Sequence, residues 1–118
     1  MNTPVDFSIA KLLKEKGFDE IVKNAYLFNS EKANVPDGEF SNKGEKYISA
    51  PIIAEVVMWL YEKHGIWICV ATIPFEKHFM FEYSIHNRSE CLTQDGVFDS
   101  PTEAYEAAIE YTLKNLLP

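Results

Sequence analysis

The side chains that could do chemistry in this chain are few. His78 and His86 are eight residues apart, which on an extended strand is about 26 Å, so they cannot share a metal ion. A His64–Cys91 or a His86–Cys91 pair could meet in space, but the spacing matches no ligand motif. We therefore expect no metal and no cofactor. The roles of the histidines and cysteines stay open: His64, His78, His86, Cys69 and Cys91.

Nucleophilic and phosphate-binding chemistry finds equally little support. Cys69 lies inside an apolar run, which predicts a buried thiol that packs as a small hydrophobic side chain and stays inert. Two cysteines are too few for a disulfide framework. The five glycines are scattered singly, so no glycine-rich phosphate loop is present. No residue is predicted to be catalytic.

Carboxylates form one stripe at helical spacing: Glu103, Glu106 and Glu110. The net charge of −7 lies mostly in residues 50–118, which carry −6 of it. Such a balance argues against direct binding to nucleic acid or to an anionic membrane. The stripe is most typical of a solvated helix face, and the alternative is an acidic face that mimics nucleic acid and occupies a DNA-binding protein.

The elements that would position these side chains are organised around residues 49–74. Apolar residues at helical spacing predict a helix over about 51–64, with Pro51 in its first position and Gly65 just past its end. Residues 66–73 then change to a period of two and are apolar on both sides, which indicates a strand that is either central in its sheet or pressed between two layers. Trp59 and Trp67 are surplus aromatics, and we expect them to form a protein-contact surface.

The flanking segments complete the predicted domain. Asp6 can cap a helix over about 7–16, and Ser100 with Glu103 can cap a last helix that runs to about residue 116. Alternating apolar residues over 79–86 and a weaker pattern from residue 90 to 98 predict two more strands. The fold class is α+β. We expect a single two-layer domain over 1–118, in the order α-(long loop)-α-β-β-β-α, whose antiparallel three-stranded meander has helices mainly on one face.

Residues 29–46 are polar and predict a flexible loop within the domain. If the chain is an enzyme of unrecognised type, its pocket is expected near this loop. The three-stranded sheet leaves open edges, so a homodimer could form through the edge of the last strand. The sequence has neither a signal peptide nor an apolar stretch of membrane-spanning length, and we expect a cytoplasmic protein.

Several short segments resemble a family of small proteins encoded by bacteriophages and by prophage-like regions of gut Bacteroidetes. The likeness lies in residues 12–18, in Ala50 and Pro51, in residues 59–66, and from Phe98 through Glu103 into the terminal helix. It excludes residues 29–46 and carries no catalytic residue. The resemblance implies an accessory protein of a mobile element, whose partner we expect to be another protein.

Overall fold

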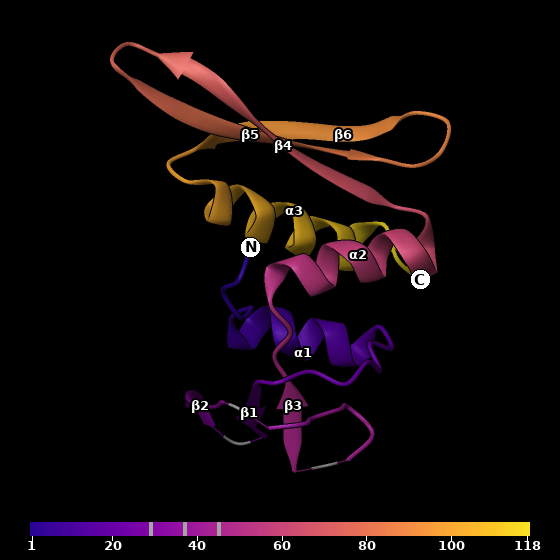
Figure 1. Cartoon of the computed structure of the whole chain (residues 1–118). Helices are drawn as coiled ribbons and strands as arrows, with labels where there is room; N and C mark the ends of the chain where they lie inside the picture. The colour runs from indigo at the N-terminus through magenta and orange to yellow at the C-terminus, as the bar shows by residue number, and fades with distance from the viewer. Residues whose placement is uncertain (29, 37, 45) are drawn as a thin grey trace.

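The computed structural model describes residues 1–28, 30–36, 38–44 and 46–118, and only the backbone of residues 30–34. Figure 1 shows the larger sheet lying over the helices, with a smaller sheet at the opposite end of the molecule. The helices and strands of the described ranges are, in chain order, α1 (Phe7–Glu15), β1 (Ala25–Leu27), β2 (Ser30–Val35), β3 (Tyr47–Ser49), α2 (Ile53–His64), β4 (Trp67–Phe75), β5 (His78–His86), β6 (Cys91–Phe98) and α3 (Pro101–Asn115).

The larger sheet is an antiparallel meander in the order β4-β5-β6. Its inward face buries Ile68, Tyr83 and Ile85, and α3 lies directly beneath it, with α2 and α1 on the same side (Figure 1). Ala108 and Ile109 of α3 are completely buried in the same core. The predicted α+β class, the meander and the one-sided arrangement of the helices are confirmed.

Strand β4 lies at an edge of this sheet, whereas β5 is central. The predicted central position is therefore wrong, and so is the alternative of a strand pressed between two layers. Ile68 is buried, but Cys69 and Ala71 on the alternate side are exposed. The helices cover only one face of the sheet, so the second apolar row of β4 faces solvent.

The smaller sheet has the order β2-β1-β3 and lies beyond α1. Strand β2 falls inside residues 29–46, so the prediction of a loop without regular structure there is wrong for Ser30–Val35. Val22 and Phe40 exchange two backbone hydrogen bonds of 2.8 Å. The Asn42 amide donates to the carbonyl of Phe18 and accepts from the N–H of Ser49, both at 2.9 Å. Residues 38–44 are thus tied to the core, while Asn29, Asp37 and Glu45 lie outside the described residues.

Capping explains where the helices begin. The carboxylate of Asp6 accepts a hydrogen bond of 2.9 Å from the N–H of Ile9, as predicted. Helix α2 begins at Ile53, two residues later than predicted. Pro51 is held outside the helix because its carbonyl accepts a hydrogen bond from the N–H of Val5. The Glu55 carboxylate instead accepts from the N–H of Ile52, which satisfies the new start.

Both remaining helix signals are present. Gly65 ends α2 with a φ of 65°, the left-handed conformation that glycine adopts without strain. Ser100 caps α3 by accepting from the N–H of Glu103, whose carboxylate reaches back to the N–H of Asp99. None of the helices in the described ranges has the length and apolar character that a membrane span requires.

Candidate interaction surface

Three large apolar side chains are exposed together where α2 meets β4. Met58, Tyr61 and Trp67 are 44%, 52% and 40% exposed, and they line a hollow of about 400 Å³. The Tyr61 and Trp67 rings meet edge to face, with centroids 5.5 Å apart. We name these three residues the α2–β4 patch. Exposed apolar side chains that gather in one place make this patch a candidate interaction site.

The local backbone explains why the patch forms. Met58 and Tyr61 are three residues apart on α2 and therefore share a face of the helix. The left-handed Gly65 turns the chain, and the N–H of Ile66 then bonds to the carbonyl of Leu60. This closure buries Ile66 in the core and brings Trp67, the next residue, alongside Tyr61.

The two tryptophans predicted to form a contact surface differ in environment. Trp67 is exposed, whereas Trp59 is only 3% exposed. The Trp59 ring packs edge to face against Phe18 and against His64. The prediction is therefore wrong for Trp59, because its side of α2 faces the segment that follows α1. Sequence reasoning missed Met58 and Tyr61, although their spacing relative to Trp59 places them on the other side of the helix.

A second exposed apolar feature is the hairpin of β4 and β5, which extends past the end of α3 (Figure 1). Phe75 and Phe79 near its turn are 53% and 60% exposed. Glu76 in the turn has a φ of 52°, as a two-residue hairpin turn requires. We call residues 73–80 the hairpin arm. The signal in the sequence was a pair of phenylalanines flanking a charged turn.

The histidines and cysteines do not assemble a reactive centre in the described ranges, where no three potential metal ligands come together. Cys69 and Cys91 are both exposed free thiols, so the prediction of a buried Cys69 is wrong. Cys91 does lie opposite His86 across β5 and β6. However, the His86 ring bonds to the Ser84 hydroxyl at 2.8 Å, and the Cys91 thiol donates to the carbonyl of Thr93.

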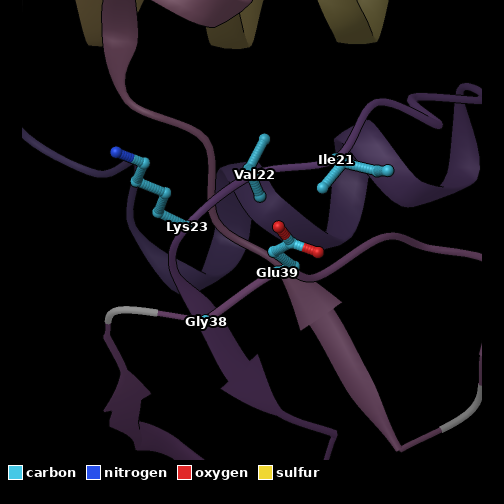
Figure 2. A pocket seen from close by; sticks show the side chains of 5 residues that line it. All are labelled: Ile21, Val22, Lys23, Gly38 and Glu39. Atoms are coloured by element: carbon cyan, nitrogen blue, oxygen red, sulfur yellow. The ribbon is translucent and has the colours of Figure 1, made fainter.

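A hollow of about 520 Å³ lies next to residues 38 and 39, in the region where an enzyme pocket was expected. Figure 2 shows its lining, in which the Lys23 ammonium points away from the Glu39 carboxylate. Ile21 at its rim is 70% exposed. The hollow contains none of the three histidines, and its two charged groups do not form a pair that could exchange a proton.

His64 lines a separate hollow of about 480 Å³ between the end of α2 and the turn after β5. Its ring is held against Trp59 at a centroid distance of 4.9 Å. His78 packs in the same way against Phe75 in the hairpin arm. Both contacts give these rings a packing role.

The three carboxylates of the predicted acidic face have different local roles. Glu110 is paired with Lys114 at 2.6 Å, and Glu103 caps the start of α3. Burial raises the pKa of the Glu106 carboxyl, and the nearby charges of Asp6 and Glu103 raise it further. A mimic of nucleic acid needs a continuous row of free carboxylates, whereas one member of this stripe is neutralised and another is half-buried.

In comparisons with known proteins, no family model, curated protein or solved structure matches the chain. The candidate site therefore rests on the geometry of the α2–β4 patch and the hairpin arm.

Proposed function

We propose that this chain is a protein-binding accessory domain that contacts its partner through the α2–β4 patch. The observation that carries the proposal is the exposure of Met58, Tyr61 and Trp67 around one hollow. Aromatic residues and methionine are the residue types enriched at the centres of protein interfaces. The patch contains no charged residue, which suits desolvation on binding.

The resemblance of the sequence to small phage and prophage proteins supplies the expected setting, a mobile element. In that setting the domain acts by occupying or recruiting another protein. Its acidic surface outside the patch favours a protein partner over nucleic acid, because a −7 chain repels phosphates.

The test is affinity capture of the tagged chain, co-expressed with an untagged copy that its intact mass distinguishes, from a bacterial lysate with and without nuclease, read by mass spectrometry. The expected result is a stoichiometric protein partner, the same chain or another, whose recovery is insensitive to nuclease. Tyr61→Ser and Trp67→Ala are expected to reduce recovery at least about tenfold, the effect of an interface hot spot. Tyr111→Ser is the matched control, because Tyr111 is a half-exposed tyrosine on α3, outside the patch. Recovery that is unchanged in both patch variants would contradict the proposal.

A further inference from the structure

The turn between β4 and β5 determines which backbone groups of β4 face away from β5. Phe75 and His78 flank a two-residue turn, and residues in these positions are joined by a backbone hydrogen bond. Hydrogen-bonded and non-hydrogen-bonded pairs alternate along an antiparallel ladder. The N–H and C=O groups of Ile68, Val70 and Thr72 therefore point outward, to the free edge of the sheet. Pro74 is next in this series, where its missing N–H removes no ladder bond.

These outward groups are available for pairing. Apart from the ladder with β5, no backbone group of Trp67–Phe75 is hydrogen-bonded to another backbone group within the described ranges. A long edge strand with unpaired backbone groups is a template for a further strand. Proteins usually protect such an edge with charged residues, bulges or a covering segment.

The two edges of the larger sheet differ in this protection. Strand β4 contains no charged residue and pairs with β5 in unbroken register. Strand β6 carries Asp95, and its ladder with β5 shifts register in two places. Bulges and charges disfavour pairing with another chain. The open edge is therefore that of β4, and the earlier expectation of contact through the last strand is replaced.

The open edge of β4 is complementary to itself. A two-fold axis beside Val70 places that residue opposite Val70 of a second copy, and Ile68 opposite Thr72. The same three residues that have outward groups then pair with one another through about six hydrogen bonds. In this register Pro74 falls outside the paired segment, so its missing donor costs nothing.

The antiparallel arrangement also joins the two exposed apolar features. The patch lies at the start of β4 and the hairpin arm at its end. Pairing places Ile73 opposite Trp67 of the second copy and brings Phe75 toward that copy's patch. Each copy offers the same two surfaces, which is the self-complementary contact of a two-fold dimer. Two chains of charge −7 also approach most favourably where neither carries a charge.

We propose that the partner at the α2–β4 patch is a second copy of this chain, which pairs β4 with β4 into one continuous six-stranded antiparallel sheet. This inference rests on the proposed function, because it names the occupant of the same patch. The outer, helix-free face of the sheet remains open in the dimer.

The first test measures molecular mass in solution by size-exclusion chromatography with light scattering. Wild type is expected at twice 13.5 kDa. Thr72→Pro removes an outward N–H without removing a bond to β5, and we expect it to weaken dimerisation about 100-fold, as loss of paired hydrogen bonds and steric exclusion predict. Gln94→Pro is the matched control, because the same alternation makes the Gln94 N–H point outward on β6. Circular dichroism checks that both variants are folded.

The second test fixes the register. Cys69 is predicted opposite Ala71 of the second copy as a non-hydrogen-bonded pair, with Cα atoms about 4.5 Å apart, within the range of a disulfide. Ala71→Cys in a Cys91→Ser background is therefore expected to form a covalent dimer under mild oxidation, seen on a non-reducing gel. Gln94→Cys in the same background has two thiols on the same sheet and should stay uncrosslinked.

A wild-type chain that remains monomeric at about 100 µM, where even a weak dimer is populated by mass action, would overturn the inference. A dimer that survives Thr72→Pro as well as it survives Gln94→Pro would also overturn it. So would a dimer in which the Ala71→Cys variant forms no disulfide with Cys69 of the second copy. The proposed function fails separately. A monomeric chain whose capture of another protein depends on Tyr61 keeps the function and loses the dimer, whereas Tyr61→Ser without effect on any association removes both.

Discussion

The indole ring of Trp59 meets the phenyl ring of Phe18 edge to face, with the ring centroids 5.2 Å apart. The two side chains are 3% and 1% exposed. Phe18 directly follows Gly17, the left-handed residue that closes the end of α1, whereas Trp59 lies in the middle of α2. This contact fixes α2 against the N-terminal helix and leaves Met58 and Tyr61 on the solvent side.

Trp59→Ala should therefore destabilise the fold strongly, while Trp67→Ala should not. Emptying the Trp59 site leaves a cavity beside Phe18 and His64, and we expect a loss of about 3–5 kcal/mol in the free energy of unfolding. Trp67 is 40% exposed, so its truncation should cost less than about 1 kcal/mol. Urea unfolding at one protein concentration measures both. Equal losses would show that the two tryptophans do not divide into a core residue and a surface residue.

Gly96 is required by the close approach of β6 to β5. A Cβ at this position would lie 2.5 Å from the Cβ of Glu82, which is opposite Gly96 in the ladder. We expect Gly96→Ala to cost about 1–3 kcal/mol, the range of overpacking, and to lower the Tm by several degrees. Gly44→Ala is the control, since a Cβ there would meet nothing within 4 Å. A Tm for Gly96→Ala that matches that of Gly44→Ala would refute this account of the close approach between β5 and β6.

Both thiols should react in the folded protein. Cys69 and Cys91 are exposed, and Cys69 is on the helix-free face of the sheet, which stays open in the proposed dimer. Titration with a disulfide reagent is expected to modify two thiols per chain at rates within about tenfold of those in urea, because access and thiolate fraction control the reaction. Cys91→Ser isolates the signal of Cys69. A Cys69 that reacts only after unfolding would mean that another surface covers this face.

The sequence was most informative where local chemistry determines the structure. The Asp6 and Ser100 caps and the Gly65 stop each depend on one or two residues close in sequence, and all three are present. The polar strand β2 has no apolar alternation, so no pattern marks it, and it exists because β1 supplies backbone partners. Backbone pairing with a neighbouring strand leaves no trace in the composition of β2 itself.

The sequence was less informative about which apolar residues are exposed. The two apolar rows of β4 predict burial on both faces of the strand, yet only the row containing Ile68 packs against the helices. Whether a second layer covers the other row depends on the number of helices and on their placement. Trp59 and Trp67 likewise differ only in the direction that α2 and the Gly65 turn give their side chains. Residue type alone does not contain that direction.

The environment of Glu106 predicts that removing its charge stabilises the folded protein, by an amount that depends on pH. Burial, and then the charges of Asp6 and Glu103, raise the pKa of this carboxyl in the folded state. The folded state therefore binds the proton of Glu106 more tightly than the unfolded state does. The stability that this proton contributes is lost as the pH rises through the folded-state pKa. Glu106→Gln, which stays neutral, should be more stable than wild type at pH 7. The gain should stay below about 1 kcal/mol because the group is only partly buried.

Thermal unfolding of wild type and Glu106→Gln between pH 3.5 and 7.5 tests this prediction. The difference in Tm is expected to shrink as the pH falls, and to vanish below about 4.3, where an ordinary glutamate also becomes protonated. Glu110→Gln is the matched control on the same helix. It removes the ion pair with Lys114 at 2.6 Å, and so should lower stability at pH 7 by up to about 0.5 kcal/mol. A Glu106→Gln difference that is constant over the whole pH range would show that packing, and not charge, distinguishes the variant, since only a group that titrates differently in the two states makes stability depend on pH.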